Sequence, residues 1–407
     1  MTLALPAWRH WPALQELGLS RCRLGPAAAA SLAAAHWPAL QVLSLGGNRS
    51  LGSAGAAALA AGRWPALRLL KLGCTKVGDA GAAALAAARW PALEELVLSQ
   101  CGLGPAGTAS LAAARWPALH TLELWANRVG DAGAASLAAA RWPALQTLGL
   151  SDTGLGPAGA ASLAAAPWPA LQVLELHSNE DLGAAALSTA CWPALRVLRL
   201  GLTRVHDAGA ASLAAARWPA LEELDLGFCK LSPAGAASLA AAHFPALQVL
   251  EIGMNSVGDA GAASLAAAHW PDLHKIDIGY AELGPAGAAA LAAARWPALR
   301  DLSLLGNNNV GPDGVASITA GRPALVKIDL NGCRMGDPGA ASLAAARWPA
   351  LRKLSVATNS LSPAGAAALA AARFPLLRHL VLSGGELQHA EQALLRAAWP
   401  GIWVEVL

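Results

Sequence analysis

The sequence contains no run of about 20 uninterrupted apolar residues, which a membrane-spanning helix needs. Its apolar share is nevertheless 55% of 407 residues, because it is rich in alanine runs that Gly, Arg, Ser or Pro interrupt every few residues. The start, MTLALPAWRHWPALQEL, also lacks the basic stretch and continuous apolar core of a signal peptide. We therefore expect no membrane segment and no secretory leader.

Excess charge and linkers are absent too. The net charge is +3, whereas domains that bind nucleic acid are usually strongly basic, so we expect no nucleic-acid partner. No charge run, Ser-rich linker or change of composition divides the chain. Although the length would allow two or three domains, we predict one domain over residues 1–407.

What the sequence does contain is one repeated unit. The stretch LAAARWPAL at 85–93 recurs at 111, 137, 213, 291 and 343, and the prolines of this motif recur every 26 residues, with intervals of 27, 24 and 25 once each. A fixed period of this size is typical of a solenoid, which we expect to have fifteen or sixteen repeats. The 24-residue unit lacks two residues before its helix, so we expect a shortened or irregular helix there.

Residues 219–244 show how one repeat is built. Leu221, Leu224 and Leu226 predict a short strand, and Pro233 suits the first position of a helix, where its missing N–H costs nothing. His243, like the arginines of other repeats, is expected at the helix end, where a cation or donor meets free carbonyls. One such unit cannot cover its own apolar faces, so stability requires stacked repeats.

Six cysteines are present, and four share one repeat position. These four, at least three repeats apart, should be about 14 Å or more from one another, which is beyond disulfide reach. We predict buried, reduced thiols and an intracellular, cytoplasmic protein. Cys74 and Cys101 are in adjacent repeats, but their side chains should diverge. The four that share a position are Cys22, Cys101, Cys229 and Cys333.

The patterns LxxLxLxxCxL at 221–231 and LxxLxLxxNxV at 119–129 resemble leucine-rich repeats. The 26-residue period resembles the cysteine-containing class, and the GAASLA and GAAALA helices are similar to the GALA-type repeats of bacterial effectors. This resemblance implies an α/β solenoid shaped as a right-handed horseshoe. Its parallel β-sheet would form the concave face and its short helices the convex face. For function the resemblance implies only a tendency to bind proteins.

Relatives in the cysteine-containing class often carry an F-box and act as substrate receptors of ubiquitin ligases. Here we interpret Trp8 to Trp11 as the tail of a helix that runs into the first strand, which leaves no room for an F-box. The far end, PGIWVEVL, is predicted to finish on a strand. The chain could still be the substrate-recognition portion of such a receptor or effector.

Several motifs resemble those of ligand-binding or modification sites. GLGPAG at 102–107 and 154–159 has the wording of a dinucleotide fingerprint, with Glu123 and Glu175 21 residues on. Its central leucine belongs to the core and its proline removes an N–H, so we interpret it as a repeat turn. The sequon at Asn48 is interpreted as a buried turn, and the thirteen Trp-Pro pairs as packing wedges. Neither a metal-spaced histidine pair nor a catalytic set is present, so we expect no enzyme, no cofactor and no metal.

Function should therefore lie at the variable repeat positions. Counting from the leading leucine, positions 3, 5 and 7 should face the concave surface, with position 8 at its rim. Position 5 is mostly acidic from Glu123 to Asp329, whereas position 8 turns apolar in four consecutive repeats. The residues that we predict to contact a partner are Arg199, Leu202, Asp225, Phe228, Glu251, Met254, Asp277 and Tyr280, with Trp125 and His177 at position 7.

An apolar row beside acids resembles an interface with an apolar core and a charged rim. The partner would be a protein or peptide with basic character and apolar anchors, and the chain a non-catalytic scaffold. Two other interpretations stay open for the row: local packing under the following turn, and drift at an unselected position.

Overall fold

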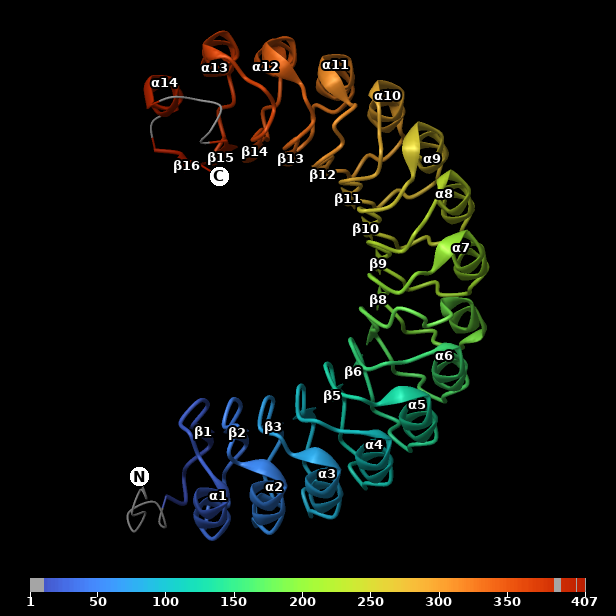
Figure 1. Cartoon of the computed structure of the whole chain (residues 1–407), viewed down its shortest axis with the longest axis vertical. Coiled ribbons are helices and arrows are strands. Elements are labelled where there is room, and N and C mark those ends of the chain that lie inside the picture. Colours follow the sequence, from blue (N-terminus) through green and yellow to red (C-terminus); the bar gives the residue numbers. More distant parts are fainter. Residues whose placement is uncertain (1–10, 384–388, 400, 407) are drawn as a thin grey trace. The chain divides into compact units, whose positions relative to one another are not determined.

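The computed structural model describes residues 11–383, 389–399 and 401–406. Each repeat forms a short strand followed by a helix, and the described chain contains two compact units. The first unit is residues 1–203 with 216–219, and the second is residues 204–215 with 220–407. Within each unit the strands line the concave side and the helices the convex side (Figure 1). The single solenoid over residues 1–407 stays a prediction.

Fifteen elements belong to the first unit, and all but one of its helical segments are α-helices. They are β1 (Glu16–Gly18), α1 (Pro26–Ala33), β2 (Val42–Ser44), α2 (Gly52–Ala60), β3 (Leu69–Lys71), α3 (Gly78–Ala86), β4 (Glu95–Val97), α4 (Pro105–Ala112), β5 (Thr121–Glu123), α5 (Gly130–Ala138), β6 (Thr147–Gly149), α6 (Pro157–Ala164), β7 (Val173–Glu175), η2 (Ala184–Thr189) and β8 (Val197–Arg199).

The second unit begins with a helix and ends with a strand. Its elements are α7 (His206–Ala214), β9 (Glu223–Asp225), α8 (Pro233–Ala240), β10 (Val249–Glu251), α9 (Gly258–Ala266), β11 (Lys275–Asp277), α10 (Pro285–Ala293), β12 (Asp301–Ser303), α11 (Gly311–Gly321), β13 (Lys327–Asp329), α12 (Gly336–Ala345), β14 (Lys353–Ser355), α13 (Pro363–Ala370), β15 (His379–Leu382), α14 (His389–Ala398) and β16 (Trp403–Val406).

The strand register repeats the sequence period. Leu224 pairs with Leu250, and Leu250 with Ile276, in parallel strands that follow the chain order. The interval falls to 24 residues between Val173 and Val197, where the helical segment is the 3-10 helix η2. The expectation of an irregular helix in the short repeat is therefore confirmed, and β7 and β8 remain paired across it.

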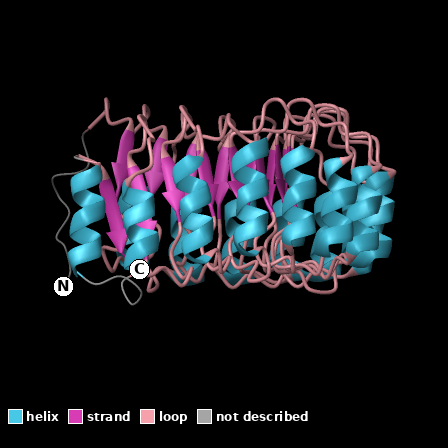
Figure 2. Cartoon of the chain, turned by 90° about the horizontal axis from the view of Figure 1, so that it is seen from above, coloured by secondary structure: helices cyan, strands magenta, loops and turns pink. Residues whose placement is uncertain are grey.

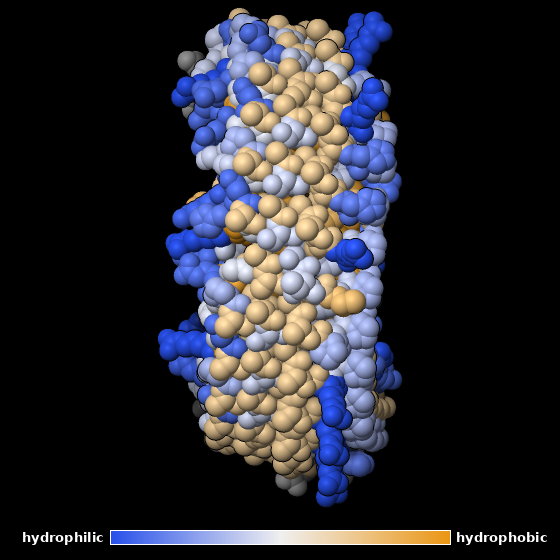
Figure 3. Space-filling view, turned by 90° about the vertical axis from the view of Figure 1, so that its right-hand side faces the viewer, coloured by the Kyte–Doolittle hydropathy of each residue, from blue (hydrophilic) through white to orange (hydrophobic). Residues whose placement is uncertain are grey.

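Strands and helices form two layers, with the loops at the two margins (Figure 2). The middle residue of each strand, such as Leu224 or Leu250, is buried, whereas the residues on either side of it are mostly only half-buried. The alternation predicted for positions 3 to 5 is confirmed. On the face drawn in Figure 3 the helices present mostly small apolar side chains, and hydrophilic side chains gather at both margins.

The Trp-Pro corners pack against one another, as predicted. The rings of Trp64 and Trp90 stack with their centroids 6.2 Å apart, and those of Trp348 and Phe374 at 6.1 Å. Twelve such aromatic side chains are fully buried, including Trp270 and Trp296. These residues are packing wedges between successive repeats.

Buried asparagines connect adjacent turns of the chain. Asn255 Oδ1 accepts from the N–H groups of Cys229 and Leu231, both at 2.9 Å. Asn255 Nδ2 donates to the carbonyls of Leu226, one repeat earlier, and Ile252. Asn48 makes the same kind of bonds to Leu24, Leu19 and Leu45, so its sequon is part of the core.

An aspartate at the start of one helix caps the next helix. Asp207 Oδ1, on α7, accepts from Ser232 N at 2.8 Å, and its Oδ2 accepts from Ser232 Oγ, just before α8. A carboxylate here meets orphan N–H groups and the positive end of the helix dipole. Equivalent bonds are made by Asp79 to Gly104, Asp131 to Gly156, Asp259 to Gly284 and Asp337 to Ser362.

All six cysteines are free, and Cys101, Cys229 and Cys333 are buried as predicted. The prediction is wrong for Cys22, which is exposed because no described repeat packs on its outer side. Cys74 and Cys101 diverge: the Cys74 thiol contacts Gln100 Oε1, whereas the Cys101 thiol contacts the Leu72 carbonyl.

Candidate functional site

Repeat position 8 has a left-handed backbone wherever that position falls within the described residues. Only glycine adopts this conformation without strain, and bulky side chains there are unusual. Glycines fill it at Gly47, Gly306 and Gly332, with φ between 66° and 76°. The other residues at this position are Arg21, Cys74, Gln100, Ala126, Asp152, Ser178, Leu202, Phe228, Met254, Tyr280 and Thr358.

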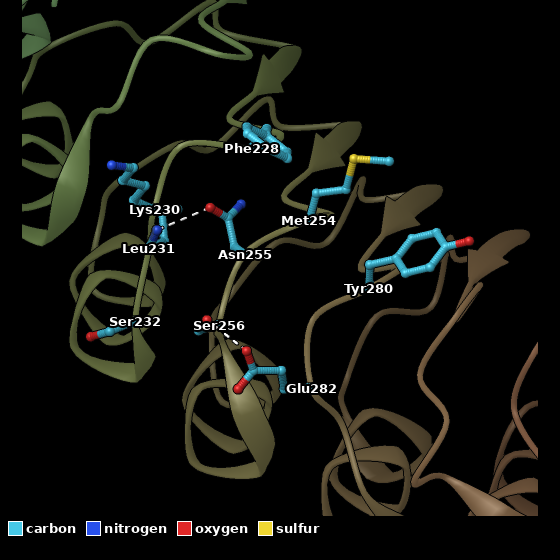
Figure 4. Close-up of a pocket in the computed structure, with 9 residues that line it drawn as sticks. All are labelled: Phe228, Lys230, Leu231, Ser232, Met254, Asn255, Ser256, Tyr280 and Glu282. Carbon is cyan, nitrogen blue, oxygen red and sulfur yellow. Dashed lines mark hydrogen bonds between the residues drawn. The ribbon is translucent and has the colours of Figure 1, made fainter. Parts of the chain in front are cut away.

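Three consecutive repeats of the second unit carry bulky apolar side chains at this strained position. Phe228, Met254 and Tyr280 have φ values of 58°, 56° and 50°. Their side chains are 52%, 54% and 50% exposed. Figure 4 shows them side by side at successive strand ends, and we call them the position-8 row. Each of the three residues is therefore about half-buried in the fold and half-exposed to solvent.

The position-8 row forms one wall of a groove of about 650 Å³. The floor includes Leu231 and Asn255, whose hydrogen bond of 2.9 Å holds adjacent turns together (Figure 4). Lys230, Ser232, Ser256 and Glu282 supply polar groups along the other side of the groove. The Ser256 hydroxyl donates to Glu282 Oε1 at 2.7 Å, so this edge is ordered by its own contacts.

Tyr280 also contacts the turn that follows it. A Cβ built on Gly306 would stand 2.2 Å from Tyr280 Cε1, so the ring rests on the glycine backbone. One face of the tyrosine is therefore packed, as the local-packing interpretation expects, while half of the side chain stays exposed. Because the ring is supported from below, it presents a fixed surface to the groove.

Leu202 occupies position 8 in the first unit, with φ 62° and an exposure of 45%. Trp125, at position 7 of β5's repeat, is 40% exposed, and His177, at position 7 of β7's repeat, is half-buried. These three residues belong to the first unit and are not part of the groove.

The acids predicted for the rim make local bonds. Asp225 is buried and its Oδ1 accepts from Gly227 N at 2.8 Å, and Asp277 Oδ1 accepts from Gly279 N at 2.9 Å. Glu251 Oε1 pairs with Lys275 Nζ at 2.5 Å. These side chains stand on strands β9 to β11, and none of them lines the groove.

In the first unit, Arg199 Nη1 and Glu175 Oε1 form an ion pair of 2.5 Å. Burial, and the neighbouring carboxylate of Glu175, raise the pKa of Glu123 to about 7. Its Oε2 would lie 1.9 Å from a Cβ at Gly149, which separates the two acids along the sheet. The Glu123 carboxylate therefore packs against Gly149 and is largely shielded from water.

The two GLGPAG motifs have structural roles. Gly104 N, in the first GLGPAG motif, donates to Asp79 Oδ1 at 2.6 Å, so a carboxylate of the protein occupies the start of α4. Asp131 does the same at Gly156 in the second motif. No cluster of His, Cys, Asp and Glu that could hold a metal occurs within the described residues. None of the helices in the described ranges is long and apolar enough to cross a membrane.

A family model described as Leucine Rich repeat matches residues 38–60, 66–86, 219–240, 245–266 and 324–344. The fold of these segments is the alternation of parallel strand and helix described above. These five segments match leucine-rich repeats. Assignment to the cysteine-containing class stays a prediction. No curated protein matches the sequence.

Solved structures resemble this chain at low identity. A chain in the crystal structure of the yeast Rad7 and Elc1 complex aligns with a TM-score of 0.53 and 16% identity, covering 95% of this chain and 88% of that chain. At this identity the likeness shows a shared fold. An internalin, InlF, from Listeria monocytogenes gives a TM-score of 0.42 and 17% identity over 72% of this chain and 82% of that chain. LegL7 from Legionella pneumophila gives 0.41 and 16%, over 61% and 87%.

The left-handed backbone at position 8 was not predicted from the sequence. A usable signal was present, because the glycines at Gly47, Gly306 and Gly332 and the aspartate at Asp152 share that position. Glycine and aspartate adopt positive φ more readily than bulky residues do, so their recurrence at one position indicates a left-handed backbone there. The groove beside the row was missed too, because its polar edge comes from positions 10 and 12.

Proposed function

We propose that this chain is a non-catalytic scaffold that binds a protein or peptide, and that the position-8 row is its main contact in the second unit. The observation that supports this proposal is the combination of bulk, exposure and left-handed backbone at Phe228, Met254 and Tyr280. Strained backbone costs stability, and such strain concentrates at functional sites.

The energetics favour a binding role over a packing role. A left-handed backbone costs a bulky residue roughly 1–2 kcal/mol relative to glycine. Half-exposed side chains regain only part of that through burial, since full burial of a large apolar side chain contributes about 1.5–3 kcal/mol. A partner that covers the groove would bury the rest of each ring and desolvate the row. Aromatic residues in such central positions dominate the affinity of protein interfaces.

The proposed partner carries apolar anchors that fit the groove of about 650 Å³ beside the row. Lys230 and Glu282 at its edge would select the polar groups that flank those anchors. We further propose basic character in the partner, because the acidic side chains of Glu251 and Asp277 stand on β10 and β11, in the repeats that carry Met254 and Tyr280. Trp125, His177, Arg199 and Leu202 are proposed as contacts of the first unit.

The experiment has two stages. The intact chain is first used to isolate partners, which are identified by mass spectrometry, and the affinity of each purified partner is then measured. Phe228→Ala and Tyr280→Ala should each weaken binding by about 1–2 kcal/mol or more. Their melting temperatures should barely move, because exposed residues contribute little to stability.

Thr358→Ala is a matched control, because Thr358 occupies position 8 with φ 57° in a repeat outside the groove. It should leave affinity unchanged. If the row serves local packing instead, Phe228→Ala will lower the melting temperature and leave binding intact. Replacing Asp225, Glu251 and Asp277 by Asn or Gln should mainly slow association and reduce its salt dependence.

A second candidate is the substrate-recognition portion of an F-box-type receptor or GALA-type effector. The chain in the yeast complex, with a similar fold, was solved with a second protein bound. Of the segment Trp8 to Trp11, whose interpretation as a helix tail bears on this candidate, only Trp11 is described, and it belongs to no helix. Isolation of a ubiquitin-ligase adaptor together with the intact chain would favour this candidate over a plain scaffold.

A further inference from the structure

One corner of the second unit departs from the Trp-Pro pattern. The sequence there is AGRPAL at 320–325, so an arginine precedes the proline where tryptophan usually stands. Arg322 takes the place of the ring in the stack: its guanidinium carbon lies 5.6 Å from the centroid of Trp296, whose other neighbour in the stack is Trp270. The side chain is 9% exposed, which is rare for arginine.

The buried guanidinium is only partly bonded. Nε donates to the Leu291 carbonyl at 3.0 Å, and Nη2 donates to the carbonyls of Leu291 and Ala294, at the end of α10. Nη1, which carries two further N–H donors, makes no hydrogen bond to any residue in the described ranges. Arg322 also makes no ion pair within those ranges. The helix end offers only a partial negative charge, so the positive charge is incompletely balanced.

The pKa of Arg322 reflects its burial and the lack of a nearby carboxylate. Desolvation lowers the pKa of Arg322, and no acidic residue acts against it. Natural proteins generally pair buried charges, because an unpaired one is costly. A guanidinium in this state can donate hydrogen bonds to an external anion.

Arg322 also lines an open hollow of about 510 Å³. Two further nitrogen-bearing side chains line it, those of His269 and Arg295, and both are exposed. The walls are apolar and come from Pro271, Ala294, Trp296 and Pro297. No acidic residue lines the hollow, although Asp272 follows Pro271 in the chain.

We propose that this hollow, the Arg322 hollow, binds an oxyanion, the phosphate or carboxylate group of a ligand. Arg322 is the inner partner through its unbonded edge, because guanidinium forms short, paired hydrogen bonds with such groups. Arg295 and His269 contact the anion from the mouth of the hollow. The stacked Trp270 and Trp296 rings hold the guanidinium in place, so the Arg322 side chain loses little conformational entropy on binding.

The chain contains a comparable hollow without a buried cation. It lies at the corner of Trp348, Phe374 and Trp399, has a volume of about 690 Å³, and carries the exposed Arg347 and Arg373. There a ring fills the place that Arg322 takes at the other corner. We therefore expect no specific anion binding at the Trp348 corner, and Arg347→Gln is a matched control.

The test is calorimetric titration of the intact chain with inorganic phosphate, and separately with acetate, at constant ionic strength. Saturable binding of either anion supports the proposal, and the tighter of the two identifies the class of the group. Arg322→Met should weaken binding at least about tenfold, a change of roughly 1.4 kcal/mol. Arg295→Gln with His269→Gln should weaken it several-fold, and Arg347→Gln should leave it unchanged.

Two outcomes overturn the proposal: absence of saturable binding of both anions, or equal affinity in wild type and Arg322→Met. Circular dichroism shows whether the Arg322→Met chain folds. If it does not fold, the double variant of Arg295 and His269 decides the question, because both residues are exposed and their replacement leaves the stack intact. Unchanged affinity in that variant then counts against the site.

Discussion

The ring of Tyr280 lies against the backbone of Gly306, so closely that a Cβ on the glycine would stand 2.2 Å from Tyr280 Cε1. Gly306 also has a φ of 71°, so glycine is favoured at this position both by the left-handed backbone and by the contact with the ring. The next repeat must present a bare left-handed residue for the tyrosine to lie flat beside the groove. The position-8 row is therefore supported by the repeat that follows it.

Gly306→Ala should destabilise the chain by more than its backbone strain alone. Strain accounts for roughly 1 kcal/mol, and displacement of the tyrosine ring adds about 1–3 kcal/mol, as overpacking does. Urea unfolding measures the sum. Gly332→Ala is the matched control, since Gly332 has the same repeat position and a φ of 66°, with its nearest neighbour 3.5 Å from the added Cβ. Equal losses in the two variants would contradict the contact, and Tyr280→Ala should rescue only Gly306→Ala.

Asp337→Ala should lower the free energy of unfolding by about 1 kcal/mol, as loss of a helix cap usually does, because Asp337 caps α13 through Ser362. Hydrogen bonds from the Ser362 side chain and N–H lower the pKa of Asp337. An acid with a lowered pKa stabilises the fold above its unfolded value and loses that effect as pH falls through the folded value. The difference in free energy of unfolding between wild type and Asp337→Ala should therefore vanish below about pH 4.

Asp313 provides the control for this cap. It is also in the first turn of a helix, α11, but its carboxylate makes no hydrogen bond to the next helix within the described residues. Asp313→Ala should lose only the dipole contribution of roughly 0.3–1 kcal/mol. Thermal unfolding from pH 3 to pH 8 compares the two variants. A pH dependence shared by both would argue against the cap.

Glu123 should make the chain less stable as pH rises from about 4.5 to about 7, the range between the ordinary and the folded pKa of its carboxyl. The folded chain holds the proton that the unfolded chain releases in this range, so ionisation opposes folding. Glu123→Gln should therefore gain stability relative to wild type at pH 8, by roughly 1–2 kcal/mol after allowance for solvent screening. Below pH 4.5 the two should converge. Thermal unfolding of wild type and Glu123→Gln across this pH range checks the prediction, and equal stability of the two chains at pH 8 would contradict it.

Trp270→Phe should cost only about 1–2 kcal/mol in free energy of unfolding, because the smaller ring leaves only a small cavity in the stack. The Trp270 indole N–H is buried with no hydrogen-bond partner, so its removal loses no bond. Phe244 and Phe374 already fill the same corner in two repeats. Trp270→Ala should instead cost about 3–5 kcal/mol through the cavity it leaves.

Trp90→Phe completes this comparison. The Trp90 indole donates to the Gly62 carbonyl at 3.4 Å, so this variant loses a bond that Trp270→Phe does not. The additional cost should be about 0.5–1.5 kcal/mol. Denaturant unfolding of the three variants gives the ranking, and a larger loss for Trp270→Phe than for Trp90→Phe would refute the explanation.

The repeat register could be predicted from the sequence because it depends on a single strong period. Leu224, Leu250 and Ile276 are paired in the sheet because proline and leucine recur at the same interval. The irregular η2 was predictable for the same reason, since two residues are missing before it. The burial of Cys22 was predicted wrongly, because burial depends on a neighbouring turn that its own repeat cannot supply.

The site was less accessible from the sequence. Apolar bulk at Phe228 and Tyr280 is visible in the letters, but the left-handed backbone that strains them arises from the turn geometry. The local bonds of Asp225 and Asp277 depend on rotamers that no pattern encodes. Arg322 could have been noticed as the missing tryptophan in AGRPAL, yet its burial follows from the stack around it.

The aspartate caps make the pair of repeats, and not the single repeat, the unit that a deletion or duplication must respect. Asp207 on α7 caps α8, and Asp259 on α9 caps α10, so capping and capped helices alternate from α7 to α10. Removal of one repeat from this stretch would place two capping helices or two capped helices side by side and leave a carboxylate or N–H groups without a partner. Removal of two adjacent repeats keeps the alternation, so this stretch can change length in pairs at little cost to its helix ends.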